Sequence, residues 1–186
     1  MSFQSQKISQ LNRKDKSDKG NWDSKIEKLC KKINSRKEYY TTSSCAGRII
    51  LIKAADEKQE NLFIFRIHKK INFSQLRKEI EKAAGKERGL VYFKQEPCIL
   101  HVACSNIDNA QKLVDKAKFC GWKKSGMMST RKRVVLELIS TEHLEFPIIN
   151  NGKILMSDEY LKLVVKEANR KLEKSWEKIK KLENLL

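Results

Sequence analysis

The sequence predicts an α+β fold in which a mixed sheet of about six to eight strands is flanked by helices, one of them long and C-terminal. Apolar runs rich in β-branched and aromatic residues alternate along the chain with segments of helical period. No G-x-G-x-x-G or Walker loop joins a strand to a helix, so a Rossmann-type nucleotide site is disfavoured. Because 186 residues are enough for one domain with a core, we expect a single domain over residues 1–186.

The first elements are an arm, a helix and two strands. Residues 1–21 are polar and lysine-rich, which is typical of a basic N-terminal arm. Apolar positions then recur at helical spacing and predict a helix over about 23–36. The apolar runs RIILIK (48–53) and LFIFRI (62–67) predict strands buried on both faces, which favours a sheet covered by helices.

A second group of elements continues this alternation. Asn72 begins a capping box for a helix over about 73–84, which Gly85 ends as its C′ residue. Strands follow at 89–95 and 98–104, because both segments are again apolar and β-branched.

The last elements are a helix, a strand and a long terminal helix. A helix with apolar positions from Ile107 to Ala117 facing inward is expected to stop at Gly121, and KRVVLELI (132–139) predicts a further strand. Over residues 157–186 apolar positions step by four and three along one narrow seam. We expect this seam to pack on the protein's own sheet or helices in a monomer; the alternative is a dimeric coiled coil.

The composition indicates a basic globular protein. Forty basic against 23 acidic side chains give a formal charge of +17, which attracts polyanions such as nucleic acid or an acidic membrane face. The apolar stretches are far shorter than the roughly 18 residues that cross a bilayer, and the first residues lack the apolar centre of a secretory signal. We therefore expect a cytoplasmic protein with no membrane partner. The five cysteines form no C-x-x-C pair and the histidines no H-x-x-x-H spacing, so no metal site is expected.

The sharpest basic cluster follows Trp122. It contains five cations and no acid: Lys123, Lys124, Arg131, Lys132 and Arg133. Either it holds phosphates while the Trp122 ring stacks on a base, or it is a hairpin with an exposed basic tip.

Two polar segments carry the other candidate chemistry. TTSSCAGRI (41–49) gathers hydroxyls, a thiol and a glycine before an apolar strand, which suits a carboxylate, ribose or phosphate. Within it, Cys45 is a nucleophile or a structural thiol, and Arg48 is an anion partner or a surface charge. Glu96 is a base or a turn-stabilising acid, and His101 is a catalyst or a hydrogen-bonded core residue.

Four segments resemble, in this order, the tRNA wybutosine-synthesizing protein 3 family: DKSDKGNWD, NSRKEYYTTSSCAGRI, FKQEPCILHVAC and AKFCGWKKSG. The resemblance covers roughly residues 3–175. The family's S-S-C-S-G-R signature falls on Ser43 to Arg48, with Ala46 in place of a serine. Its D-x-S-x-K-G-x-x-D pattern falls on Asp15, Ser17, Lys19, Gly20 and Asp23.

Several positions depart from the family pattern. Phe63 and Ile67 stand where the family has a tryptophan and a serine ahead of a histidine, here His68, and Lys123 replaces an arginine. The Phe63 ring is still able to stack, whereas Ile67 lacks a hydroxyl that would hold His68 for catalysis. Ala46 likewise removes one donor from the serine-rich segment.

The resemblance implies an S-adenosylmethionine-dependent methyltransferase with a non-Rossmann fold. The implied reaction methylates N4 of a tricyclic wyosine-type guanine next to the anticodon of tRNA(Phe), during wybutosine biosynthesis. The implied partner is the anticodon arm of that tRNA. The alternative is a noncatalytic RNA-binding module in which TTSSCAGR is a structural turn.

Methyl transfer to a ring nitrogen needs an in-line approach and a group that takes the nitrogen's proton. Our candidates for that group are Asp23, Glu96 and His101. A polar loop with an arginine suits the carboxylate of the cofactor, and its residues are Ser43, Ser44, Gly47 and Arg48. The residues expected to contact the tRNA are Lys19, His68, Trp122, Lys123, Lys124, Ser125, Arg131 and Arg133.

Overall fold

The computed structural model describes residues 2–12, 23–55 and 61–186, and within them it has five helices and nine strands. The predicted α+β class with a long C-terminal helix is confirmed. The strands form two antiparallel sheets of four and five strands, in place of the single mixed sheet predicted from the sequence. Each sheet lies in its own compact unit, here called unit 1 and unit 2. A single domain over residues 1–186 stays a prediction.

Unit 1 contains the described residues up to Ala46, Cys98–Thr141 and Ser175–Leu186. Its sheet has the strand order β1-β5-β7-β6. Its complete elements are α1 (Phe3–Leu11), α2 (Glu27–Asn34), β1 (Tyr39–Cys45), β5 (Ile99–Cys104), α4 (Ile107–Phe119), β6 (Gly126–Ser129) and β7 (Val134–Ile139).

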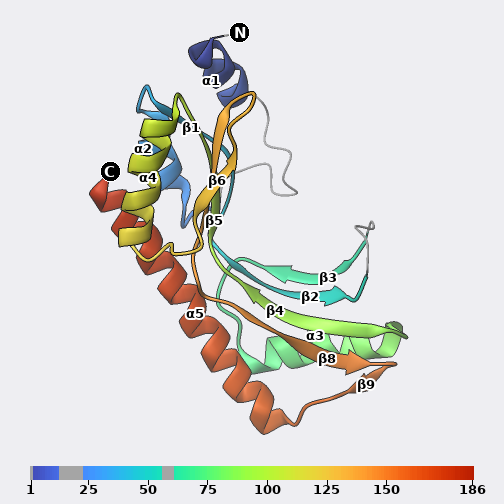
Figure 1. The fold of residues 1–186 in the computed structure, drawn as a ribbon. Coiled ribbons are helices and arrows are strands. Elements are labelled where there is room, and N and C mark those ends of the chain that lie inside the picture. Colours follow the sequence, from blue (N-terminus) through green and yellow to red (C-terminus); the bar gives the residue numbers. More distant parts are fainter. Residues whose placement is uncertain (1, 13–22, 56–60) are drawn as a thin grey trace. The chain divides into compact units, whose positions relative to one another are not determined.

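The core of unit 1 lies between its sheet and the helices α2 and α4, which cover one face of that sheet (Figure 1). Leu100 and Val102 of β5 and Leu136 and Leu138 of β7 are buried there. Because side chains alternate along a strand, the residues between them point to the opposite side of these strands, away from α2 and α4. His101 and Glu137 are two of those residues, and this alternation positions the candidate site.

Strand β1 contains one extra residue relative to its partner β5. Thr41 pairs with Val102 and Ser43 pairs with His101, so Thr42 forms a β-bulge between them. The side chain of Thr41 stays on the buried side, where its hydroxyl accepts a hydrogen bond from Asn34 of α2 at 2.9 Å.

Unit 2 contains the described residues within 47–97 and residues 142–174. Its sheet has the order β3-β2-β4-β8-β9, and α3 lies against one face of it (Figure 1). Its complete elements are β2 (Arg48–Lys53), β3 (Phe63–Ile67), α3 (Phe73–Lys86), β4 (Leu90–Glu96), β8 (Leu144–Asn150) and β9 (Lys153–Ile154).

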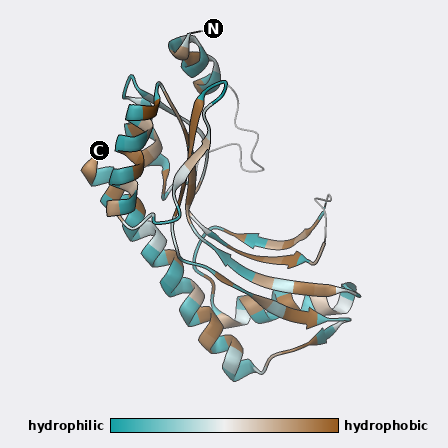
Figure 2. Cartoon of the chain, in the orientation of Figure 1, coloured by the Kyte–Doolittle hydropathy of each residue, from teal (hydrophilic) through white to brown (hydrophobic). Residues whose placement is uncertain are grey.

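Helix α5 (Asp158–Leu185) is the predicted long C-terminal helix. Ser157 accepts a hydrogen bond from the backbone N–H of Tyr160 at 3.3 Å, as expected of a cap. Polar and apolar residues alternate along the helix (Figure 2). The predicted seam is buried within the chain, so the expected intramolecular packing is confirmed: Leu161, Val165, Ala168, Leu172, Ser175, Ile179 and Leu182.

Several predicted boundaries were wrong for identifiable reasons. The N-terminal segment contains helix α1, in which Phe3 packs on Tyr40 with ring centroids 5.2 Å apart, so the arm is not all irregular. Helix α3 continues through Gly85, because Glu87 donates its N–H to the Ala83 carbonyl at 2.8 Å. Ile107 was expected to face inward, but it begins α4 and is 54% exposed.

Candidate active site

Three polar side chains form a connected chain on the sheet of unit 1. Ser43, His101 and Glu137 lie on β1, β5 and β7 and are direct cross-strand partners. The Ser43 hydroxyl is 2.7 Å from Nδ1 of His101, and Nε2 of His101 is 3.0 Å from Oε1 of Glu137. Ser43 is exposed, whereas the His101 and Glu137 side chains are 25% and 34% exposed. The chain therefore ends at the protein surface with a hydroxyl.

This geometry sets the hydrogen-bonding roles within the chain. A carboxylate only accepts, so Nε2 of the imidazole carries its proton and donates it to Glu137. Nδ1 of neutral His101 is then an acceptor for the Ser43 hydroxyl. A proton that reaches the Ser43 oxygen is able to pass to Nδ1, and the imidazolium so formed lies against the negative charge of Glu137.

Glu137 was not among the predicted site residues. It lies in the strand sequence VVLELI, where Leu136 and Leu138 on either side are buried. A single acid between two core positions of a strand is a signal that its side chain faces away from the core. The partner across the sheet, however, depends on strand register that the sequence does not contain.

Ser43 and Ser44 point in opposite directions, although they were predicted to act together. Ser44 lies on the buried side, where its side chain hydrogen-bonds the Cys30 thiol of α2. Burial raises the pKa of Cys30 to about 11, and this hydrogen bond opposes the rise. The segment was expected to be a polar loop or turn. It instead forms the edge strand β1, which extends through Cys45. Polar side chains hid this strand from a pattern search based on apolar runs.

Arg48 and Glu96 lie together in unit 2 and form an ion pair as cross-strand partners on β2 and β4. The Arg48 guanidinium carbon also lies 5.2 Å from the ring centroid of Phe63 on β3. The structure therefore brings the predicted cofactor arginine and one candidate base into direct contact. His68, a predicted tRNA contact, follows the end of β3 and is partly buried.

Trp122 and Ser125 were predicted to contact tRNA, and the structure corrects both predictions. The Trp122 side chain is fully buried, and its indole N–H donates to the Lys178 carbonyl at 3.2 Å. Its ring is therefore not accessible for stacking on a base. The Ser125 hydroxyl is also buried, where it donates to the Trp122 carbonyl at 2.6 Å and accepts from the Ile139 N–H at 3.1 Å. Both residues hold the connection between α4 and β6.

The predicted cations around this connection are exposed. β6 and β7 form a hairpin, and residues 130–133 form its tip. A hairpin with an exposed basic tip was the second of the two alternatives for this cluster. Arg133 donates from its guanidinium to the Tyr40 hydroxyl at 3.2 Å. Lys19 lies outside the described residues. The exposed predicted cations are Lys123, Lys124, Arg131 and Arg133.

Asp23 begins the turn that leads into α2. Its carbonyl accepts hydrogen bonds from the backbone N–H groups of Ile26 and Glu27 at 2.9 and 3.1 Å. Its carboxylate accepts a hydrogen bond from the backbone N–H of Lys25 at 3.4 Å. These contacts belong to the turn before α2, which begins at Glu27, whereas the helix was predicted to start at about residue 23.

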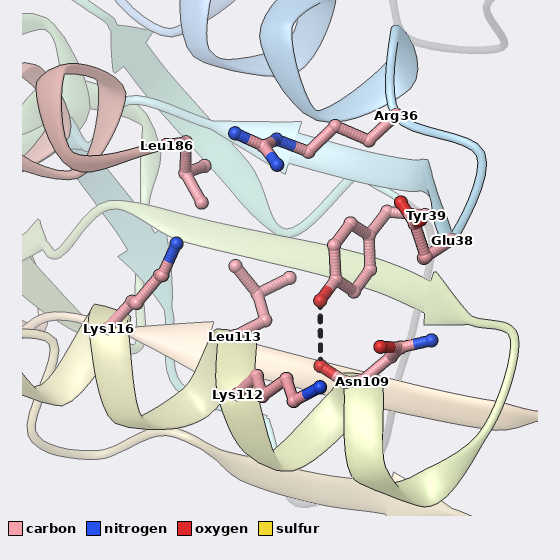
Figure 3. A pocket seen from close by; sticks show the side chains of 8 residues that line it. All are labelled: Arg36, Glu38, Tyr39, Asn109, Lys112, Leu113, Lys116 and Leu186. Atoms are coloured by element: carbon pink, nitrogen blue, oxygen red, sulfur yellow. Dashed lines mark hydrogen bonds between the residues drawn. The ribbon is translucent and has the colours of Figure 1, made fainter.

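A cavity of about 250 Å³ lies elsewhere in unit 1, between α4, the start of β1 and the chain end (Figure 3). Cations line it at Arg36, Lys112 and Lys116, and Tyr39 donates its hydroxyl to the Asn109 carbonyl at 2.9 Å. None of the predicted site residues lines this cavity. Its lining carries no imidazole or thiol, so it offers no counterpart to the chain formed by Ser43, His101 and Glu137.

Two further searches concern the described residues alone. In residues 2–12, 23–55 and 61–186, no three His, Cys, Asp or Glu side chains gather in a way that would hold a metal ion. Over the same ranges, none of the helices has the length and apolar character that a bilayer crossing requires.

Sequence and fold both match known proteins. The family model described as Methyltransferase TYW3 matches residues 4–186. A Thermococcus sibiricus protein named tRNA(Phe) 7-((3-amino-3-carboxypropyl)-4-demethylwyosine(37)-N(4))-methyltransferase is 35% identical over 170 residues, which are 90% of this chain and 85% of the relative. A Danio rerio protein named tRNA wybutosine-synthesizing protein 3 homolog is 35% identical over 191 residues, covering 100% of this chain and 74% of its own. A solved Pyrococcus horikoshii structure aligns with a TM-score of 0.80 at 32% identity, over 98% of this chain and 89% of that one.

Proposed function

The chain belongs to the methyltransferase TYW3 family, and we propose that it transfers a methyl group from S-adenosylmethionine to N4 of the wyosine-type guanine next to the anticodon of tRNA(Phe). The observation that carries this proposal is the family match over residues 4–186 together with relatives named for this reaction. The same match favours an enzyme over a noncatalytic RNA-binding module. We further propose that the reaction takes place in the cytoplasm, on the anticodon arm.

The residues present fit an S-adenosylmethionine cofactor in their chemistry. When bound, this group supplies a methyl on a cationic sulfur, and it also carries an ammonium and a carboxylate. The paired side chains of Arg48 and Glu96 in unit 2 offer one partner for each of these last two charges. Gly47, just before Arg48, is buried and adopts a φ of 98°, a backbone conformation that a residue with a Cβ rarely adopts. We propose that Gly47 and Arg48 hold the amino-acid end of the cofactor.

Ser43 and Ser44 have different prospects as cofactor residues. The exposed Ser43 hydroxyl is able to meet a ligand, and we propose that it does so. Ser44 faces Cys30, so we propose that its contribution is to hold β1 against α2.

We propose His101 as the group that takes the proton from N4 of the base. As the new N–CH₃ bond forms, the methyl group leaves the sulfonium sulfur, which becomes a neutral thioether, and the N4–H bond must break. The proton passes to the Ser43 oxygen while the Ser43 hydroxyl proton moves to Nδ1 of His101. Glu137 then stabilises the imidazolium through its hydrogen bond to Nε2. This role is supported by the hydrogen bonds that join His101 to Ser43 and to Glu137.

Exposed cations complete the proposal for the tRNA. Lys123, Lys124, Arg131 and Arg133 carry charge at the surface of unit 1, where phosphates are able to reach it. Contacts of Lys19 and His68 with the tRNA remain predictions.

The proposal is tested by methyl incorporation. Purified tRNA(Phe) that carries the tricyclic base without its N4 methyl is incubated with the protein and S-adenosylmethionine labelled in the methyl group. We expect one methyl per tRNA, and none with tRNA(Phe) that has an unmodified guanine at this position. If no methyl is incorporated and calorimetry detects no cofactor binding at millimolar concentration, the RNA-binding module replaces the enzyme.

A further inference from the structure

The face of the unit 2 sheet opposite its core presents two aromatic rings. In β4, Val91 and Phe93 are buried, so the alternate residues Tyr92 and Lys94 lie on the other face. Phe63 lies on this same face, because the guanidinium of Arg48 contacts its ring. Phe63 is 44% exposed, which is unusual for a phenylalanine within a sheet and leaves ring surface available to a ligand.

These two rings form part of one cross-strand row, which we name the aromatic row. Phe63 of β3 pairs with Ile52 of β2, and Ile52 pairs with Tyr92 of β4. The two aromatic residues are therefore two strand spacings apart, about 10 Å. That separation leaves room for one planar ring at each position without overlap.

A second row of charged residues lies next to the first and is named the cationic row. Arg66 of β3 pairs with Ile50 of β2, and Ile50 pairs with Lys94 of β4. Lys94 in turn pairs with Glu145 of β8, and its Nζ forms an ion pair with Oε1 of Glu145 at 2.6 Å. The guanidinium carbon of Arg66 is 5.1 Å from the Phe63 centroid, and Nζ of Lys94 is 5.7 Å from the Tyr92 centroid. Each ring thus has a cation of the neighbouring row over it, and Tyr92 is partly buried whereas Phe63 is exposed.

We propose that this face binds unpaired RNA bases, which stack on Phe63 and Tyr92 while Arg66 takes the phosphate between them. Sheets that present aromatic rings on one face bind single-stranded RNA in this way, because every base has a flat surface that stacks. S-adenosylmethionine also contains a purine, but it has no phosphate for a row of cations to bind. The inference rests on the proposed function, because an anticodon arm presents a loop of unpaired bases.

The test measures RNA affinity and not methyl transfer. Fluorescence anisotropy of the full chain with a labelled anticodon stem-loop RNA gives Kd for the wild type and for each variant. Phe63→Ala should weaken binding at least fivefold, which corresponds to the loss of about 1 kcal/mol of stacking. Phe63→Tyr should keep the wild-type affinity, since it keeps the ring. Phe119→Ala is the matched control, because this ring is 84% exposed but lies on α4 of unit 1.

A salt series tests the cationic row separately. Arg66→Gln should lower the slope of log Kd against log salt by about 0.7, the value for one phosphate contact to a single strand, whereas Arg66→Lys should keep it. Calorimetry with S-adenosylhomocysteine, run on the same variants, tests the purine of the cofactor as the alternative ligand.

The inference is overturned if Phe63→Ala leaves the RNA affinity within twofold of the wild type, or if it weakens only the binding of S-adenosylhomocysteine. Methyl transfer by the wild type would then still support the proposed function. Conversely, Phe63-dependent RNA binding by a protein that transfers no methyl group would refute the proposed function and leave this inference standing.

Discussion

The hydrogen bond between His101 and Glu137 gives the most direct test of the proposed proton transfer. Glu137→Gln keeps the size of the side chain but removes its negative charge, so the imidazolium loses its counter-charge. A hydrogen bond to a charged group contributes about 1.5–3 kcal/mol. At 3.0 Å the bond is of normal length, so we expect kcat to fall about 10- to 150-fold. KM for tRNA should stay within twofold, because Glu137 is not expected to touch the RNA.

The assay is steady-state methyl transfer to tRNA(Phe) that carries the unmethylated tricyclic base, with urea unfolding as a check of stability. His101→Gln should lower kcat by about 10² to 10⁴. Combined with Glu137→Gln it should cause little further loss, because the two residues act as one unit. Glu167→Gln is the control, since Glu167 is also 34% exposed and forms an ion pair with Arg170, and it lies on the part of α5 that belongs to unit 2. A Glu137→Gln enzyme with wild-type kcat would refute the proton-transfer chain.

Three further predictions concern stability and tRNA binding. Trp122→Ala should lower the free energy of unfolding by about 3–5 kcal/mol in urea, because it empties a fully buried site; a loss of RNA affinity with unchanged stability would contradict that burial. Arg131→Ala should weaken tRNA binding across sequences and lower its salt slope by about one; an unchanged slope would show that this exposed cation contacts no phosphate. Burial raises the pKa of the Cys104 thiol to about 12, so its contribution to stability is complete below the ordinary thiol pKa of about 8.5 and is lost as the pH rises toward 12. Urea unfolding between pH 8 and pH 10.5 should therefore show a steeper loss for the wild type than for Cys104→Ala, and equal slopes would refute this.

The elements that bury apolar residues were predictable from local pattern. The apolar strands β2, β4 and β5 and the helices α3 and α4 lie close to their predicted positions. At the starts of α3 and α4 a side chain of the N-cap residue fixes the helix boundary. Asn72 and Asn106 accept backbone hydrogen bonds from the residues three positions later, both at 2.8 Å.

Elements held by polar or long-range contacts were not predictable in the same way. β1 is rich in threonine and serine, and its pairing with β5 joins residues about 60 positions apart, which a local pattern does not encode. For the same reason His101 was a candidate by residue type, while Glu137 was not. Trp122 illustrates the opposite error, because its basic neighbours suggested RNA contact although its ring belongs to the core.

The bulge at Thr42 has a consequence for how sequences of this family are aligned. Thr41 faces the core and Ser43 faces outward opposite His101, so the residue between them adds chain length without changing which hydroxyl meets the imidazole. A homologous strand one residue shorter at this point would keep both orientations and lose only the local bend. An alignment gap immediately before Ser43 is therefore compatible with retained chemistry. A gap immediately after Ser43 would instead move the residues that follow it to the opposite face of the strand.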